Sequence, residues 1–224
     1  MKLEPVLISI VIPAWKELEI QGLVNRYTSL QNVEVIVVLG EDDNVTPLPS
    51  GCVVIRGERG RAFQMNCGAK KSRGQIILFL HADTYVLPES FDSVRKSMED
   101  RQHSIGCYSL ELKPANFWIW LVSKVANMRT KVFKLPYGDQ AIFLRKCDFV
   151  KIGGYNNEPI LEDVLLVKAA KQIGRLVILQ HLATSSSRRW YKEGMYFTTL
   201  RNWGTMIAFV LGVSPHTLAK LFKR

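Results

Sequence analysis

A short polar patch with one carboxylate follows an apolar run of strand length. The run is Ile76 to Leu80, five large apolar residues, and His81, Ala82 and Asp83 come directly after it. Such a run is typical of a parallel strand that is covered on both faces. In open α/β sheets, ligands bind at the carboxyl ends of the strands. Asp83 is therefore a candidate ligand-binding residue.

Two chemical roles are open to Asp83. Its carboxylate can cap the helix that Leu87, Pro88 and Glu89 begin, since Pro suits a first helical turn. It can instead hold a hard divalent cation, which takes oxygen ligands and shares its shell with a ligand's phosphates. The spacing alone does not choose between the two roles.

A second acidic pair, Glu162 and Asp163, begins a segment whose apolar residues have helical spacing. The segment predicts a helix over residues 162–174, with Gly174 as its C-terminal cap. The helix dipole favours negative charge in the first turn, which is a sufficient structural reason for both acids. Their position alone assigns them no chemistry.

The charge of the chain points to an anionic partner. Thirty Lys and Arg residues against twenty Asp and Glu residues leave a net charge of +10. Nucleic acid, a membrane surface and a phosphorylated ligand are the partners that such a charge attracts. After His181, Glu193 stands alone against the basic residues Arg188, Arg189, Lys192, Arg201, Lys220, Lys223 and Arg224. A hydrophobic content of 47% is ordinary for a globular protein and excludes disorder as the expected state.

The cysteines and the start of the chain favour a reducing compartment. Cys52, Cys67, Cys107 and Cys147 lie far apart without a C-x-x-C pair, so we expect buried free thiols and no structural zinc. The first apolar run is too short, and its flank too acidic, for a secretory signal. No run approaches the roughly 20 apolar residues of a spanning helix. We expect a cytoplasmic protein that can still lie at the inner face of the membrane.

Strands and helices are predicted to alternate in the first half of the chain. Apolar runs predict strands at 6–12, 33–39, 52–55 and 76–80. Helical spacing predicts helices at 16–30, 61–71 and 88–100. Crossover connections of this kind build a right-handed, mostly parallel sheet flanked by helices, which is the α/β class.

The rhythm changes in the second half of the chain. The predicted elements are a half-exposed strand at 106–112, helices at 117–134 and 162–174, and short strands at 141–144 and 176–179. Two helices follow from Trp190 onward, one ending near Gly212 and one from Pro215 to Phe222. We expect one α/β domain over 1–187 and a C-terminal helical extension over 188–224, packed on that domain or lying at a membrane surface.

Five motifs, in order along the chain, resemble family 2 glycosyltransferases of the GT-A fold, especially the small single-domain bacterial members. The resemblance rests on their order and covers most of the chain. The motifs are the strand that ends at Pro13 with Ala14 and Glu17 after it, Gly60 to Ala69 with Arg61 and Asn66, His81-Ala82-Asp83, Gly138 to Phe143 with Asp139 and Gln140, and Glu162-Asp163.

The resemblance implies a set of roles for an enzyme that uses a UDP-, GDP- or dTDP-sugar. Asp163 would be the catalytic base of an inverting transfer, and Asp83 with His81 would hold Mg²⁺ or Mn²⁺. The donor would be bound by Pro13, Ala14, Glu17, Arg61, Asn66, His81, Ala82 and Asp83. The acceptor side would carry Asp139, Gln140, Glu162, Arg189 and Trp190.

The chain departs from the family pattern at several positions. His81 replaces the first acid of the metal motif, and Lys16 stands where many relatives have Asn. The residue that contacts the nucleotide base is open among Glu41, Asp42 and Asp43. The stretch from Ser187 to Trp190 is similar to the end of a longer motif of processive relatives but lacks its Gln.

Other functions stay open beside the enzyme. A GT-A homologue that binds the donor without turnover is one, because His81 alters the metal motif. A basic module that binds a membrane or nucleic acid is another, although the sequence has no RNA-binding or zinc-finger signature and we expect no nucleic acid. A nucleotidyltransferase would need a Gly-rich loop after the first strand, where Pro13 and Ala14 stand. A lipid-linked acceptor suits the basic, apolar C-terminal helices.

Overall fold

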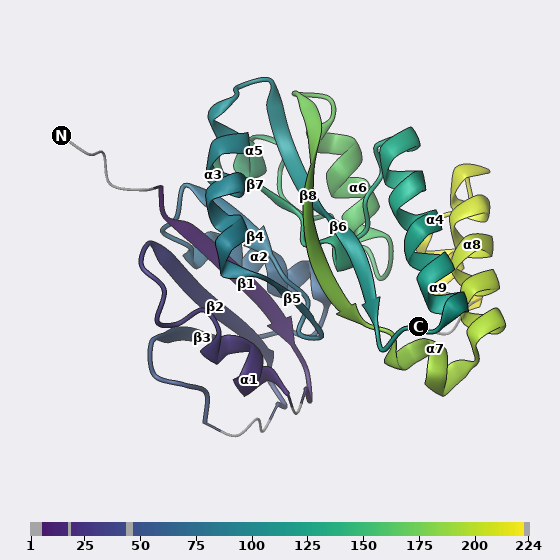
Figure 1. The fold of residues 1–224 in the computed structure, drawn as a ribbon, viewed down its shortest axis with the longest axis horizontal. Coiled ribbons are helices and arrows are strands. Elements are labelled where there is room, and N and C mark those ends of the chain that lie inside the picture. Colours follow the sequence, from purple (N-terminus) through teal and green to yellow (C-terminus); the bar gives the residue numbers. More distant parts are fainter. Residues whose placement is uncertain (1–5, 18, 44–46, 222–224) are drawn as a thin grey trace.

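The computed structural model describes residues 6–17, 19–43 and 47–221. One eight-stranded sheet in the order β3-β2-β1-β4-β7-β6-β8-β5 forms its centre, with helices on both sides (Figure 1). The strands are β1 (Ile8–Ala14), β2 (Val33–Gly40), β3 (Cys52–Gly57), β4 (Ile76–Phe79), β5 (Thr84–Val86), β6 (His103–Lys113), β7 (Phe143–Arg145) and β8 (Arg175–Ser186). The predicted helix end at Phe222, with Lys223 and Arg224, lies outside the described residues.

The helices connect and cover these strands. They are α1 (Ile20–Asn25), α2 (Arg61–Lys71), α3 (Phe91–Glu99), α4 (Phe117–Phe133), α5 (Lys146–Lys151), α6 (Glu162–Ala170), α7 (Arg188–Glu193), α8 (Met195–Val210) and α9 (Pro215–Leu221), with short 3-10 turns η1 (Pro88–Ser90) and η2 (Gly138–Gln140). Helix α2 begins and ends where the sequence predicts. In the described part of the chain, no helix is both long enough and apolar enough to cross a membrane.

The first half of the sheet is parallel and buried on both faces. Strand β1 lies between β2 and β4, and all three run in the same direction. Every residue of β1 and of β4 is buried. Ile8, Ile10 and Ile12 pack into one hydrophobic cluster, whereas Val11 packs into the cluster on the other face. The apolar run before His81 is therefore the doubly covered strand that the sequence predicts.

The second half of the sheet mixes strand directions. Strand β7 is antiparallel to both β4 and β6, β8 is parallel to β6, and β5 is antiparallel to β8. The prediction of a mostly parallel sheet thus holds for the first half and not for the second. Strand β8 has 12 residues instead of the predicted four, because it pairs with almost the whole length of β6.

Three helix predictions need correction. The helix predicted over 162–174 ends at Ala170 as α6, with Lys171 and not Gly174 at its C-cap. The helix predicted over 16–30 is reduced to the six residues of α1, because Lys16 has a left-handed backbone and residues 26–29 form turns. The C-terminal segment forms three helices in place of two. Gly194, with φ of 97°, separates α7 from α8, and this positive φ favours glycine over other residues.

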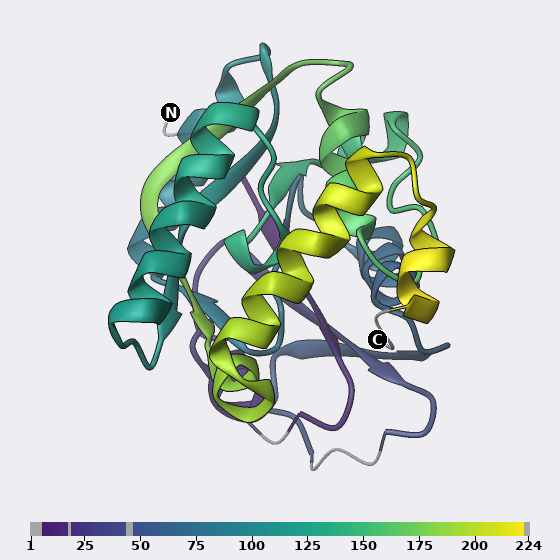
Figure 2. The ribbon, with the colours of Figure 1, turned by 90° about the vertical axis from the view of Figure 1, so that its right-hand side faces the viewer.

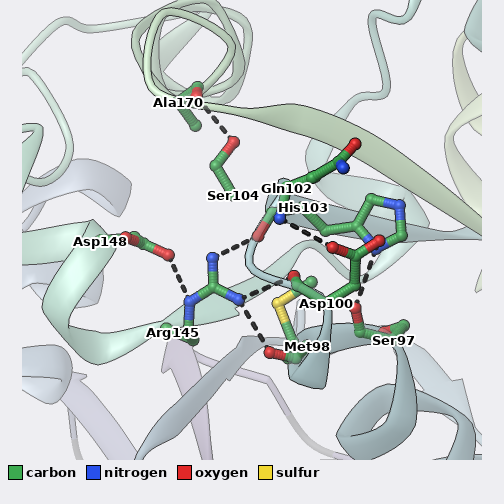
Figure 3. Close-up of polar contacts among 9 residues, drawn as sticks. All are labelled: Ser97, Met98, Asp100, Gln102, His103, Ser104, Arg145, Asp148 and Ala170. Carbon is green, nitrogen blue, oxygen red and sulfur yellow. Dashed lines mark hydrogen bonds and ion pairs between the residues drawn. The ribbon is translucent and has the colours of Figure 1, made fainter.

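Arg145 fastens β7 to the turn between α3 and β6 (Figure 3). Its guanidinium forms an ion pair with Asp148 at 2.6 Å and donates to the carbonyl oxygens of Met98, Asp100 and His103. An arginine can satisfy several acceptors at once because its donors lie in a rigid fork. The contact holds the antiparallel strand β7 at the start of β6.

The four cysteines are free thiols, as predicted. Only one prediction of burial is right, since Cys107 is fully buried while Cys147 is exposed. Cys52 and Cys67 are partly buried. Burial raises the pKa of the Cys107 thiol to about 12, so this group is an inert part of the core.

Candidate active site

A cavity of about 700 Å³ opens at the carboxyl ends of β1 and β4. Residues at the ends of β1 and β4 form one wall, which we call the sheet wall, and residues of α7 and α8 form another, which we call the helical wall. The start of α6 also lines the cavity. Among the residues that the sequence singles out, those that line the cavity are Pro13, Ala14, Glu17, Arg61, His81, Ala82, Asp83, Asp139, Glu162, Asp163, Arg189 and Trp190. The fold therefore brings together residues as far apart in the chain as Pro13 and Trp190.

Two predicted site residues do not line the cavity. The Asn66 amide donates to the Tyr155 carbonyl oxygen at 2.8 Å and accepts from the Tyr155 N–H at 2.9 Å. Gln140 is fully buried, donates to the carbonyl oxygen of Tyr108 and accepts from the hydroxyl of Thr130. In this structure both amides connect segments of the core.

Asp163 is held in place by two backbone N–H groups. The N–H of Gly138 donates to Oδ2 at 2.6 Å, and the N–H of Val164 donates to Oδ1 at 2.8 Å. A Cβ added to Gly138 would lie 2.5 Å from Nε2 of His81 and 3.5 Å from Oδ2 of Asp163. Gly138 thus lets its backbone approach both side chains, and it fixes the Asp163 carboxylate at the cavity wall.

Asp83 is exposed to the cavity and does not cap the following helix. The N-cap of η1 is Leu87, and no side chain accepts a hydrogen bond there. The hydroxyl of Thr84 lies 3.4 Å from Oδ1 of Asp83, a long contact. The structure therefore removes the capping role that the spacing left open.

The imidazole of His81 is neutral at ordinary pH. Burial lowers its pKa well below the usual value, and the positive charges of Arg61 and Arg189 lower it further. A neutral imidazole and a carboxylate are both donors that suit Mn²⁺, and the carboxylate alone suits Mg²⁺. Over residues 6–17, 19–43 and 47–221, no group of three or more His, Cys, Asp or Glu side chains is placed to hold a metal ion. Asp83 and His81 would thus need ligand phosphates or water to complete a cation's shell.

Asp139 has an unusual environment within the same cavity. Burial raises the pKa of its carboxyl group to about 6; Arg129 opposes this shift, and the charges of Asp163 and Asp83 add to it. Its Oδ1 atom is buried and has no hydrogen-bond partner among the described residues. This carboxyl group therefore changes its charge near pH 6.

Positive charge lines the cavity from both walls. The arginines that contribute are Arg59, Arg61, Arg188, Arg189 and Arg201. Arg61 pairs with Glu162 at 3.3 Å, and Arg188 pairs with Glu17 at 3.3 Å between the two walls. Arg201 pairs with Glu193 at 2.5 Å. Guanidinium groups bind phosphate oxygens in a bidentate manner, so the cavity suits a diphosphate.

Several cavity residues are missing from the sequence prediction. Trp15 lies under the guanidinium of Arg59, with 3.8 Å between the guanidinium carbon and the ring centroid. Because Trp15 directly follows Pro13 and Ala14, its position in the sequence could have predicted that it lines the cavity. Arg201 and Thr205 enter the cavity from α8, and no motif marks them. Only the path of the chain reveals these two.

The three acids after β2 also differ in their surroundings. Asp43 is buried and accepts a hydrogen bond from the N–H of Lys16 at 2.8 Å, whereas Glu41 and Asp42 are exposed. Asp43 connects the end of β2 to the loop after β1.

Comparison with protein families supplies the identification. Residues 9–151, well over half of the chain, match the model described as Glycosyl transferase family 2. The chain belongs to this family. It is a family 2 glycosyltransferase, and its curled central sheet with flanking helices is the GT-A fold. No curated protein matches the sequence in a direct search.

Solved structures similar to this family 2 glycosyltransferase include those of TarS from S. aureus. TarS 1-349 has a TM-score of 0.60 and 11% identity, with 96% of this chain and 69% of that chain covered. The complex with UDP has a TM-score of 0.59 and 13% identity, with 83% of this chain and 62% of that chain covered. The complex with UDP-GlcNAc has a TM-score of 0.61 and 12% identity, with 81% of this chain and 58% of that chain covered. At these identities the likeness shows the fold alone.

Proposed function

We propose that this glycosyltransferase transfers a sugar from a nucleoside-diphosphate donor to an acceptor hydroxyl with inversion at the anomeric carbon. The observation that carries the proposal is the Asp163 carboxylate, which two backbone N–H groups fix at the wall of a cavity lined by arginines. A fixed carboxylate beside arginines that can bind a diphosphate is what a general base for such a transfer requires.

A UDP-sugar is the donor that the comparisons favour. TarS was solved with UDP and with UDP-GlcNAc, and it shares the fold of this chain. The diphosphate would lie between Arg61 and Arg189, beside the sheet wall. Trp15 offers a flat face to a nucleotide base. We expect an enzyme that uses such a donor to lie in the cytoplasm, at the inner face of the membrane.

The chemistry follows from these positions. The acceptor oxygen attacks the anomeric carbon while the bond from that carbon to the diphosphate breaks. Asp163 takes the acceptor's proton, and the nucleoside diphosphate leaves with the electron pair of the broken bond. Arg61 and Arg189 stabilise the negative charge that grows on the leaving group. Because attack and departure occur on opposite faces, the configuration inverts.

Asp83 and His81 are the residues that would hold a divalent cation. The carboxylate is exposed to the cavity and the imidazole is neutral, so both can act as ligands. A bound Mg²⁺ or Mn²⁺ would supply further positive charge for the leaving diphosphate.

The test combines donor binding with donor hydrolysis. Calorimetric titration with UDP, GDP and dTDP, each with Mn²⁺, Mg²⁺ or EDTA, identifies the base and the cation. Hydrolysis of the matching donor is then followed by NMR, with water as the acceptor, and the first sugar anomer released should be inverted relative to the donor. Asp163→Asn should lower turnover by about 10²- to 10⁴-fold while donor affinity changes little. Asp83→Ala should abolish the metal-dependent part of binding.

The matched control is Asp92→Asn, which removes a carboxylate whose side chain is 91% exposed and lies on α3. This variant should behave as the unchanged protein does. Retention of configuration, or full activity in Asp163→Asn, contradicts the proposal. Donor binding without any hydrolysis or transfer would favour the homologue that has lost turnover.

A further inference from the structure

The outer side of α8 carries a row of large apolar side chains that nothing in the described chain covers. Tyr196, Leu200, Trp203, Ile207 and Val210 follow the spacing 4, 3, 4, 3 and therefore share one side of the helix. Between 49% and 70% of each residue is exposed. A row of this kind on a surface helix is normally turned toward a core, and an exposed apolar patch of this size is typical of an interaction site.

Helix α4 carries a similar row. Phe117, Trp120, Met128 and Val132 lie on one side of it, and each is between 49% and 76% exposed. The rings of Phe117 and Trp120 stack with centroids 5.9 Å apart, and the ammonium of Lys124 lies 5.6 Å from the centroid of Trp120. Aromatic rings and lysine stems together are typical of a surface that meets a membrane interface.

The two rows belong to one surface. Trp118 of α4 contacts the ring of Tyr196 with centroids 4.7 Å apart and donates from Nε1 to the hydroxyl of Thr199 at 3.3 Å. Figure 2 shows both helices on the same side of the molecule. We call this surface the α4–α8 face, defined by Phe117, Trp120, Met128, Val132, Tyr196, Leu200, Trp203, Ile207 and Val210.

Positive charge surrounds the α4–α8 face. The sequence has no Asp or Glu between Pro114 and Tyr137, and Lys124, Lys131 and Lys134 are exposed there. From Arg188 onward the single acid is Glu193, and it pairs with Arg201. A second copy of this chain would bring the same positive charge to the contact, which is unfavourable. An anionic bilayer offers both an apolar interior and the opposite charge.

We infer that the α4–α8 face docks the protein on an anionic membrane surface, with both helices lying in the plane of the interface. This inference extends the proposed function. What it implies for the acceptor rests on that function. Helix α8 contributes Arg201 and Thr205 to the cavity and Trp203 and Ile207 to the α4–α8 face. The cavity therefore opens beside the bilayer, where a lipid-linked acceptor can present its hydroxyl.

Vesicle flotation tests the docking without reference to catalysis. The full chain is mixed with vesicles of phosphatidylcholine alone or with 30% phosphatidylglycerol, at low and high salt. We expect binding to the anionic vesicles that weakens at high salt, with a blue shift of tryptophan fluorescence. The variants Trp203→Glu with Ile207→Glu, and Trp120→Glu with Met128→Glu, should each lower binding by about tenfold or more.

The matched control places two glutamates at other exposed apolar sites, Leu87→Glu with Val150→Glu, and should bind as the unchanged chain does. Circular dichroism confirms that each variant is folded. Absence of binding to anionic vesicles, or an equal loss in the control, overturns the inference. So does a dimer in analytical ultracentrifugation that Trp203→Glu with Ile207→Glu dissociates, because a second copy would then cover the face. Donor hydrolysis without vesicles should persist in these variants, so failure of docking and failure of the glycosyltransferase proposal are separable.

Discussion

The two walls of the cavity are held by different forces. In the sheet wall, β1 and β4 are wholly buried, and the amide of Gln64 donates to the carbonyl oxygens of Ala14 and Val38. In the helical wall, α7 has no buried residue and α8 buries Thr198, Thr199 and Thr205 alone among its described residues. The sheet wall is a rigid platform, which suits donor binding. The helical wall depends on polar contacts and, as inferred above, on an external partner.

The tight packing of the sheet wall should make it intolerant of one added methyl group. A Cβ at Gly68 would lie 2.3 Å from Cγ1 of Val11, so Gly68→Ala should destabilise the fold by about 3 kcal/mol. Gly204 on α8 has no atom of the described residues within 4 Å of its Cβ position, so Gly204→Ala should stabilise the fold by about 0.5–1 kcal/mol. Urea unfolding followed by circular dichroism measures both. Equal effects at the two glycines would remove the contrast between the walls.

Asp139 lies in the cavity between the two walls, and its carboxyl group should make the stability of the protein depend on pH. Its pKa is about 6 in the folded protein and 3.8 ordinarily, so the folded state holds the proton more tightly. The stability that the protonated Asp139 contributes to the folded state is therefore lost as pH rises from about 4 to 6. Asp139→Asn should be more stable than the unchanged protein by about 2 kcal/mol at pH 7.5, and the difference should shrink toward pH 4.

Thermal unfolding of both proteins across that pH range gives the difference directly. A difference that grows toward acid pH would contradict the raised pKa of Asp139. Asp92→Asn serves as the control, since its exposed carboxylate should leave the pH profile unchanged.

The ion pair between the walls should have the smallest effect on stability. Arg188 and Glu17 are 63% and 28% exposed as side chains, and water screens such pairs. Arg188→Ala should therefore change the free energy of unfolding by less than about 1 kcal/mol. A double-mutant cycle with Glu17→Gln, at low and high salt, isolates the pair. A coupling above this range would show that the walls are joined more strongly than their exposure indicates.

Sequence reasoning succeeded where the information is local. The doubly buried strand before His81, the bounds of α2 and the family all follow from short apolar runs and ordered motifs. It failed where neighbours distant in sequence decide the structure. The length of β8 is set by β6, and the break between α7 and α8 comes from a single glycine conformation at Gly194.

The same division applies to the cavity. Motif positions identified Asp83, which follows β4, and Asp163, which lies in the first turn of α6. Asp139 was identified by the resemblance of its motif to the family pattern. Motif positions could not show that the amides of Asn66 and Gln140 form hydrogen bonds within the core, because both side chains are polar and both lie within motifs.

By itself the sequence determined the family, the order of the main elements and most of the residues around the cavity, since these depend on residue type and spacing. Only the tertiary structure decided that the N–H of Gly138 fixes Asp163, that Arg201 enters from α8, and that α4 and α8 present their apolar rows outward. Helical periodicity shows which side chains share a face. The direction in which that face points is set by packing against the rest of the chain.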